Sequence, residues 1–210
     1  MILNLYLTIY KIEYKLNFKR KKHMKNILEV CLSPDLGGLE IHVKDLTKFL
    51  GVKAILNPKG KVKELFTKEY INFETIGRYS FIKLAQIIDE NKIDVVHINW
   101  TKDIPIAVLA KLISKQKPKI VQTRNMNMTR FKDDFYHKFL YKNISTIVGI
   151  STKVSEQLNK FIPQDVRPKI ITWYSGVPKP ILIDENRKKE LKDSFGIKDE
   201  FIVCIVARIH

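Results

Sequence analysis

Cysteine is scarce in this chain of 210 residues. The two cysteines, Cys31 and Cys204, lie far apart, and each lies within an apolar run. Two thiols in that arrangement exclude a disulfide scaffold, and their spacing is not that of a zinc site. Free cysteines usually behave as small buried hydrophobic residues, so we predict that both lie in the core and take no part in chemistry. The pattern favours a reducing, cytoplasmic compartment.

Long apolar runs are also missing. Residues 1–10 are apolar, but a membrane-spanning helix needs about 20 such residues. The basic cluster 19–22 follows this run, whereas a secretory signal carries its positive charge in front, which argues against a cleaved signal. Two interpretations of residues 1–23 remain: a basic amphipathic extension that lies on a membrane, or an extension upstream of the natural start of the protein. We favour the second.

Acidic residues are few, since 22 Asp and Glu stand against 38 Lys and Arg and leave a net charge of +16. Such a surface attracts phosphates in nucleic acid, in anionic lipid headgroups or in nucleotide diphosphates. The lysines are scattered, and no helix-turn-helix, zinc-finger or RNP pattern is present, so we expect no nucleic-acid partner. A general bias in composition would produce the same charge without any functional meaning.

Short apolar runs alternate with helical patterns from Asn26 onward. Leu39, Val43, Leu46 and Leu50, for example, recur at helical spacing. Strands separated by helices of about ten residues imply right-handed βαβ crossovers and a parallel sheet. We therefore predict an α/β fold, a doubly wound parallel Rossmann-like sheet over residues 24–180. The expected strands are 26–31, 52–56, 71–76, 93–98, 119–123, 146–150 and 169–174.

The sequence changes character after this domain. Pro178, Pro180 and the charged stretch 184–192 predict a linker and a surface helix over 181–198. An apolar strand is then expected at Phe201–Ala207. A parallel strand that is apolar on both faces cannot bury them alone. We therefore expect residues 199–210 to hold the first strand of a second domain.

Candidate site residues follow the strands, because doubly wound sheets bind ligands beyond the carboxyl ends of their strands. Gly37 and Gly38 open the first helix, where backbone N–H groups can approach an anion. This loop is neither a dinucleotide fingerprint nor a P-loop. His97 and Asn99, at the end of the fourth strand, point to the same side if the strand extends as far as Asn99. Arg124 after the fifth strand suits a phosphate or a carboxylate. Each of these residues is also common in a purely structural role.

Five segments, taken in order, resemble the family 4 retaining glycosyltransferases, which have the two-domain GT-B fold. The resemblance spans about Lys25 to Val177 and continues to Arg208. The segments are Gly37-Gly38-Leu39-Glu40 with its helix, Asp94-Val95-Val96-His97, Ile147-Val148-Gly149-Ile150-Ser151, Tyr174-Ser175-Gly176-Val177, and Phe195-Gly196-Ile197 before the strand that ends in Ala207-Arg208.

The resemblance implies transfer of a sugar from a nucleotide-diphospho-sugar, with retention at the anomeric carbon and without a metal or other cofactor. The acceptor would bind to the N-terminal domain, and the donor mainly to the C-terminal domain. Arg208 would stabilise the leaving diphosphate and, with His97, is a candidate catalytic residue. The donor diphosphate or sugar would contact Gly37, Gly38 and Glu40.

Asn99, Arg124 and Asn125 would border the acceptor. Asn125 stands where many members of that family have His, and because Asn is neither an acid nor a base, any role is limited to hydrogen bonding. A glycan or lipid-linked acceptor, such as a lipopolysaccharide core, would suit the basic surface and a peripheral position on the inner face of the membrane.

About one typical domain of such an enzyme is absent from the sequence, so we expect this chain to be inactive without a C-terminal domain or a partner chain. Two alternatives remain open. One is a non-catalytic interaction or regulatory protein that keeps only the acceptor domain. The other is an unrelated doubly wound binding protein, such as a flavodoxin-like domain.

Overall fold

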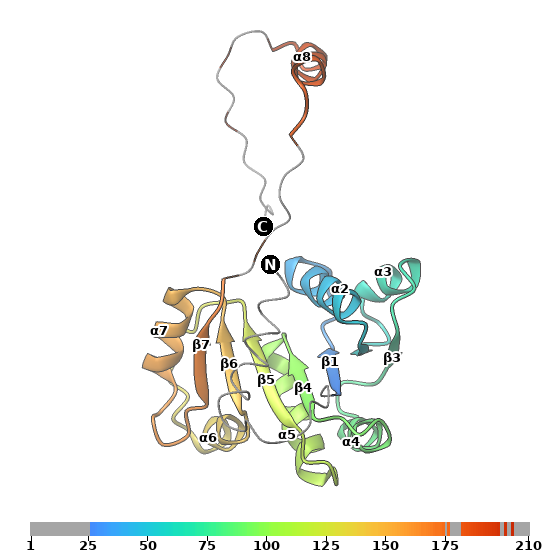
Figure 1. Ribbon diagram of the computed structural model, residues 1–210. Coiled ribbons are helices and arrows are strands. Elements are labelled where there is room, and N and C mark those ends of the chain that lie inside the picture. Colours follow the sequence, from blue (N-terminus) through green and yellow to red (C-terminus); the bar gives the residue numbers. More distant parts are fainter. Residues whose placement is uncertain (1–25, 175, 177–181, 198–199, 201–202, 204–210) are drawn as a thin grey trace, which may run out of the picture. The chain divides into compact units, whose positions relative to one another are not determined.

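The computed structural model describes residues 26–174, 176, 182–197, 200 and 203, and its core is one parallel sheet. Seven strands run in the order β3-β2-β1-β4-β5-β6-β7, and every neighbouring pair is parallel (Figure 1). The predicted doubly wound α/β fold is confirmed. The strands are β1 (Ile27–Cys31), β2 (Lys53–Leu56), β3 (Phe73–Thr75), β4 (Val95–Ile98), β5 (Lys119–Arg124), β6 (Thr146–Gly149) and β7 (Lys169–Thr172).

All seven strands expected before residue 175 are present, most of them shorter than the apolar run that predicted them. Strand order reverses between β1 and β4, so the topological switch point of the sheet lies there. The strand expected at Phe201–Ala207 lies outside the described residues, apart from Val203. The same holds for Cys204, Arg208 and the extension 1–23.

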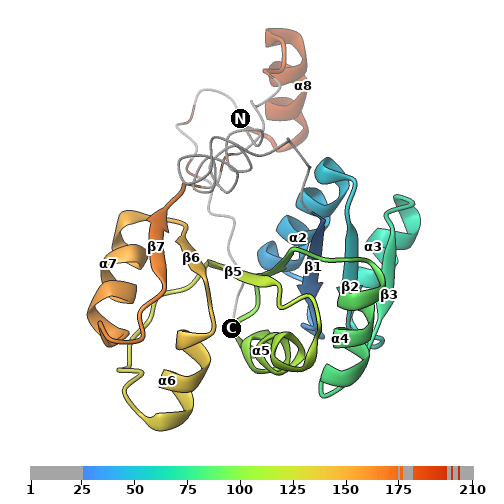
Figure 2. The ribbon, with the colours of Figure 1, turned by 60° about the horizontal axis from the view of Figure 1, so that its bottom comes forward.

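Helices cover the sheet from both sides (Figure 2). α2 (Gly38–Leu50) and α3 (Val62–Lys68) pack on one face, and α4 (Phe81–Glu90), α5 (Ile104–Ile113), α6 (Phe135–Lys142) and α7 (Thr152–Phe161) pack on the other. Right-handed crossovers explain the division, because the chain moves across the sheet in one direction from β1 to β3 and in the opposite direction from β3 through β4 to β7.

The helix α6 is missing from the sequence-based prediction. Only Leu140 and Tyr141 of this helix are buried, while Phe135, Tyr136 and Phe139 are exposed. Because large apolar side chains occur on both its faces, no one-sided stripe marks the helix in the sequence. Its start has a local signal, since the Asp134 carboxylate accepts a hydrogen bond from the backbone N–H of His137 at 3.1 Å.

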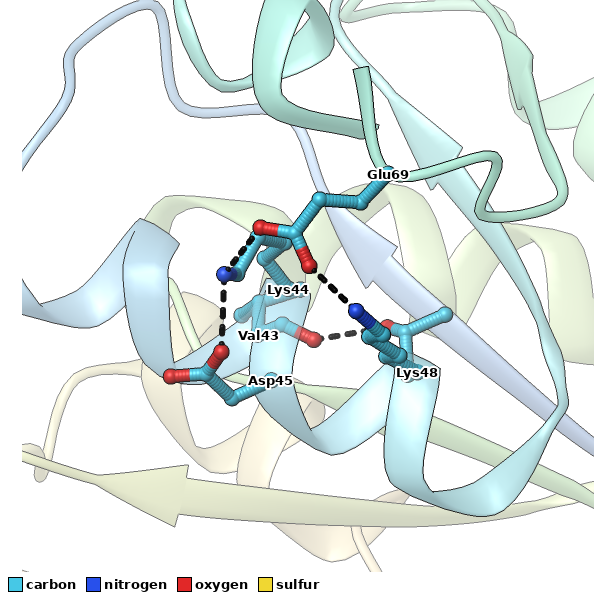
Figure 3. Close-up of polar contacts among 6 residues, drawn as sticks. Val43, Lys44, Asp45, Lys48 and Glu69 are labelled. Atoms are coloured by element: carbon cyan, nitrogen blue, oxygen red, sulfur yellow. Dashed lines mark hydrogen bonds and ion pairs between the residues drawn. The ribbon is translucent and has the colours of Figure 1, made fainter. Parts of the chain in front are cut away.

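An ion-pair cluster fastens α2 to the turn that follows α3 (Figure 3). The Glu69 carboxylate accepts hydrogen bonds from Lys44 Nζ at 2.6 Å and from Lys48 Nζ at 2.8 Å. These two lysines hold the pKa of Glu69 at about 2. Lys44 also pairs with Asp45 at 2.9 Å. The cluster links α2 to the end of α3, while the buried Val43 and Leu46 pack α2 against the sheet.

The second compact unit, Gly176–His210, contains one described helix, α8 (Glu185–Ser194). Asp184 caps it by accepting from the backbone N–H of Arg187 at 2.8 Å. None of its residues is buried. A surface helix is therefore present where the charged stretch 184–192 predicts one.

Gly149 at the end of β6 allows close packing of α7, and its replacement provides a test of the fold. A Cβ at this position would lie 2.4 Å from Ser155 Oγ and 3.1 Å from the Ser155 backbone nitrogen. The hydroxyl can rotate away, but the helix backbone must shift. We expect Gly149→Ala to lower the free energy of unfolding by about 1–3 kcal/mol in urea titrations.

Gly38→Ala is the matched control for this prediction. No described heavy atom lies within 4 Å of a Cβ built at Gly38. Alanine there should change stability by about 0.5 kcal/mol or less. Equal unfolding midpoints for the two variants would contradict the packing argument.

Candidate functional site

A buried polar row crosses the sheet at the switch point. The parallel register places Glu29 of β1 opposite His97 of β4. His97 Nδ1 lies 2.7 Å and 2.9 Å from the two carboxylate oxygens of Glu29, and His97 Nε2 lies 2.8 Å from the Thr123 hydroxyl of β5. All three side chains are buried. The row therefore ties β1, β4 and β5 together with side-chain hydrogen bonds.

His97 is 1% exposed, and both its ring nitrogens are engaged. The ring of this predicted catalytic residue is thus buried against one face of the sheet, and its catalytic role stays a prediction. His42 on α2 is close by: burial lowers the pKa of His42, and the neighbouring His97 lowers it further. Sequence reasoning missed Glu29, because one acidic residue within the apolar run of β1 carried no motif.

The next polar groups toward the carboxyl edge have unsatisfied hydrogen-bonding atoms. Asn99 Nδ2 lies 3.4 Å from Glu29, which confirms that His97 and Asn99 point to the same side. Asn99 Oδ1 is buried and has no hydrogen-bond partner among the described residues. The same is true of Nδ2 of Asn125, which follows β5. Within the part of the chain that the structure describes, Asn99 thus has an unpaired acceptor after β4, and Asn125 has an unpaired donor after β5. A buried polar atom without a partner lowers the stability of the fold unless a ligand or water binds it.

Arg124, the third predicted acceptor residue, is already engaged. Its guanidinium donates to the backbone oxygen of Met126 at 2.8 Å, to that of Asn127 at 2.9 Å and to the Thr101 hydroxyl at 2.5 Å. It thereby fastens the loop after β5 to the turn after β4. Contact between Arg124 and an acceptor stays a prediction.

The N-terminus of α2 is the predicted contact for the donor, and its backbone N–H groups are not capped by a side chain. Gly37 is the N-cap. The first N–H groups of a helix lack intrahelical partners and attract anions. Gly38 has free space where a side chain would stand. Glu40 lies in the first turn and is 5% exposed, so it points into the protein rather than toward solvent.

The loop between β1 and α2 is hydrogen-bonded to the loop that follows β2. Asn57 Nδ2 donates to the Leu32 oxygen at 3.0 Å, and the Lys61 N–H donates to the Pro34 oxygen at 3.3 Å. A Cβ at Gly60 would lie 2.9 Å from the Ser33 oxygen, so only glycine allows this approach without a shift. The first part of this loop, Leu32 to Pro34, is therefore held against the loop after β2.

Asp103 is a functional candidate that the sequence concealed. It closes the 3₁₀ turn Thr101–Asp103 directly before Ile104 and Pro105, and so reads as an ordinary helix cap. Its carboxylate instead accepts from the backbone N–H of Leu32 at 2.9 Å, across the switch point. Oδ1 is buried without a partner among the described residues. Burial raises the pKa of Asp103 to about 7.

An aromatic ring with two cations lies beside this turn. The Arg78 guanidinium lies 5.2 Å and Lys102 Nζ 5.3 Å from the ring centroid of Trp100. Sequence reasoning passed over all three, because Arg78 comes from the loop after β3 and reaches Trp100 only in the folded chain. Positive charge at this edge suits an anionic ligand.

Three further features bear on function: the buried cysteine, possible metal ligands and possible membrane-spanning helices. Burial raises the pKa of the Cys31 thiol to about 12, and this cysteine is a core residue, as predicted. The described part of the chain contains no group of three or more His, Cys, Asp or Glu side chains that could hold a metal ion. Among its helices, none has the length and apolar character to cross a membrane.

Together, the doubly wound parallel sheet and its flanking helices define a Rossmann-type domain, a class of fold whose ligands bind at the switch point. The chain belongs to the glycosyl transferase 4-like family, whose sequence profile matches residues 16–152. A search of curated proteins found no match.

Solved glycosyltransferase structures share the fold. The Rickettsia africae glycosyltransferase superposes with a TM-score of 0.61 at 21% identity, over 85% of this chain and 51% of that one. Anabaena HepE in complex with UDP gives a TM-score of 0.59 at 17% identity, over 82% and 50%. The lipopolysaccharide outer core galactosyltransferase WaaB gives 0.58 at 15%, over 76% and 48%. This chain thus spans about half the length of the structures it matches.

Proposed function

We propose that this domain binds the acceptor in a retaining transfer of sugar from a nucleotide-diphospho-sugar to a glycan or a lipid-linked glycan. The observation that carries the proposal is the pair of unsatisfied buried groups, Asn99 Oδ1 and Asn125 Nδ2, at the ends of β4 and β5. A sugar hydroxyl both donates and accepts, so it can satisfy either group. Family membership supports the reaction class.

The donor contact belongs at the N-terminus of α2. Backbone N–H groups there are uncapped, and Gly38 leaves room for a diphosphate to approach. UDP is the ligand in the Anabaena HepE structure, which supports a nucleotide donor. Arg208, outside the described residues, is proposed to neutralise the leaving diphosphate. No metal or cofactor is required in this proposal.

The acceptor is proposed to be anionic. Arg78 and Lys102 flank Trp100 close to the turn that Arg124 fastens, so positive charge lies at the edge where Asn99 and Asn125 are unsatisfied. The similarity in fold to WaaB supports a lipopolysaccharide-type acceptor. We place the protein in the cytoplasm, on the inner face of the membrane that carries such acceptors.

Within this proposal His97 is a positioning residue. Its ring is buried between Glu29 and Thr123, so it orients the ends of β1, β4 and β5 rather than touching a substrate. Activity needs a donor-binding half in addition to this domain. Sugar transfer by the purified chain alone, detected with a radiolabelled donor, would contradict that requirement.

A non-catalytic binding or regulatory role is the second candidate. Asn125 favours it, because an amide at a position where many related enzymes have His removes an acid or base. In that case the domain would bind a glycan without transferring sugar. The binding experiment below applies to both candidates, and a transfer assay with the donor-binding half added separates them.

Asn125→Ala tests acceptor binding. Calorimetric titration with a panel of anionic and neutral glycans is expected to show about fivefold or greater weakening in the variant, since one hydrogen bond is lost. Stability should be unchanged or higher, because the Nδ2 group has no partner among the described residues. Replacement of a purely structural residue would instead lower stability and leave glycan binding unchanged.

Asn91→Ala is the matched control. Asn91 ends α4, and its Nδ2 donates to the Ile87 oxygen at 2.8 Å. Its loss should lower stability by about 1 kcal/mol and leave glycan binding unchanged. The proposal fails when no glycan in the panel binds the wild-type chain, or when Asn125→Ala behaves like Asn91→Ala.

A further inference from the structure

The outer face of α6 presents aromatic rings to solvent. Phe135 is 87% exposed, Tyr136 53% and Phe139 38%. Positions i, i+1 and i+4 of a helix lie on one side, so the three rings form a continuous surface. The opposite side of α6 packs into the core through Leu140 and Tyr141. Nothing in the sugar-transfer proposal uses these rings.

A fourth ring lies beside α6 and is held in place. Phe131 is 58% exposed and meets Phe161 edge to face, with ring centroids 5.1 Å apart. The backbone N–H of Lys132 donates to the Phe161 oxygen at 2.9 Å. The loop before α6 is therefore anchored to the end of α7, and the exposed rings are presented by a fixed framework.

Basic residues are interleaved with these rings. Segment 130–142 contains Arg130, Lys132, Lys138 and Lys142 against the acidic Asp133 and Asp134, and α6 itself contains no acidic residue. Asp133 is exposed, and Lys138 Nζ lies 3.7 Å from the Asp165 carboxylate, so the segment keeps a smaller positive excess. Asp134 is occupied in capping α6 and in pairing with the His137 ring at 2.5 Å. The patch made of these four basic residues and the rings of Phe131, Phe135, Tyr136 and Phe139 is called the α6 patch below.

We propose that the α6 patch is a membrane-contacting surface that binds bilayers with anionic headgroups. Aromatic rings are stable at the level of the headgroups, and lysine side chains extend from there to the phosphates. A protein partner fits less well, because lysine is depleted from the cores of protein interfaces, whereas here it is interleaved with the rings. Positive charge complements an anionic leaflet.

The proposal stands apart from sugar transfer, although the two are compatible. α6 is the helix that follows β5, and Arg124 at the end of β5 fastens the loop between them. A bilayer against the α6 patch would therefore lie one loop away, along the chain, from Asn125. Vesicle binding can be measured without donor, acceptor or activity, so failure of one proposal leaves the other intact.

Vesicle co-sedimentation of the full chain tests the α6 patch. Vesicles of equal parts phosphatidylglycerol and phosphatidylcholine are compared with phosphatidylcholine alone. We expect binding to the anionic vesicles only, weakened by salt. Phe135→Ser with Tyr136→Ser should weaken it about tenfold or more, because two rings no longer leave water. Arg130→Gln with Lys142→Gln should weaken it to a comparable degree.

Tyr70→Ser with Tyr79→Ser is the matched control, because these tyrosines are 96% and 85% exposed and lie outside the α6 patch. This variant should bind like the wild type. Repeating the series in a chain that starts at Met24 separates any contribution of residues 1–23. Equal loss in the control, equal binding to neutral vesicles, or loss only when residues 1–23 are removed would each overturn the proposal.

A measurement of how deeply position 135 enters the bilayer gives a second test, which does not depend on variants that could fail to fold. Phe135→Trp introduces a fluorophore at the most exposed position of the α6 patch, in a background in which Trp100 and Trp173 are replaced by Phe. Brominated lipids should quench its fluorescence when anionic vesicles are added. Absence of quenching in a variant that unfolds at the wild-type urea midpoint would refute membrane contact at α6.

Discussion

Glu29→Ala is expected to lower the free energy of unfolding by about 3–5 kcal/mol. Glu29 is fully buried and holds the His97 ring by two contacts of 2.7 Å and 2.9 Å. Its removal leaves two buried groups, His97 Nδ1 and the Asn99 amide nitrogen, without the carboxylate that they contact. The loss far exceeds that of an ordinary ion pair, because no water reaches these groups to replace the carboxylate. Urea unfolding followed by circular dichroism measures it.

Glu74→Ala is the control for this prediction. Glu74 pairs with Lys53 at 2.8 Å on the neighbouring strand, but its side chain is one-third exposed. Water can replace that partner, so the cost should be about 1 kcal/mol or less. Glu29→Gln keeps the shape and one acceptor and should fall between the two. A Glu29→Ala variant as stable as Glu74→Ala would show that the buried row does not hold the strands together.

The Asp103 carboxyl should lower stability as the pH rises from about 4 to about 7. Burial of His42, which lowers the pKa of that imidazole, contributes in the opposite direction. Burial raises the pKa of Asp103 from 3.8 to about 7 in the folded chain. A raised pKa means that folding favours the protonated form. The favourable contribution is therefore complete below about pH 4, declines as the pH approaches 7, and is absent above it. The shift corresponds to about 4 kcal/mol, as an order of magnitude.

Asp103→Asn isolates this effect. An asparagine can still accept the hydrogen bond from the Leu32 N–H but carries no charge at any pH. Its Nδ2 would be a buried unpaired donor, which costs about 1–3 kcal/mol independently of pH. Relative to the wild type, the variant should become progressively more stable as the pH rises.

The unfolding midpoints of the wild type and Asp103→Asn are compared from about pH 4 to about pH 8, a range that includes both the unfolded and the folded pKa of Asp103. Asp45→Asn serves as the control, because the Asp45 side chain is 56% exposed. Parallel pH profiles for the wild type and Asp103→Asn would mean that the Asp103 carboxyl titrates in the folded chain as it does in water. The Arg78 charge opposes the shift, so its replacement should extend the decline in stability to higher pH.

Local pattern was sufficient to predict much of the fold. The apolar run Ile93–Ile98 contains β4, and the glycine pair in the loop after β1 precedes and opens α2. Such runs mark parallel strands covered on both faces, and their alternation with helices leaves few topologies. Where the pattern failed, at α6, the cause was the exposed rings of Phe135 and Tyr136, which obscured the one-sided stripe.

The candidate site was predicted only in part. The search at the ends of strands selected Asn99, Arg124 and the Gly37-Gly38 turn from the sequence, and their roles in binding stay predictions. What each residue contacts could not be predicted. Arg124 reads as a free cation in the sequence, yet its nitrogens bind Met126, Asn127 and Thr101.

The sequence by itself determined the class of fold and the order of the seven strands that precede residue 175, because these depend on periodicity and on the turns between elements. Only the tertiary structure decided that Glu29 meets His97 and that Asp103 reaches Leu32, since these pairs are separated by 68 and 71 residues. Burial gives the two contacts their energetic weight, because a charge removed from water depends on the partner that folding supplies.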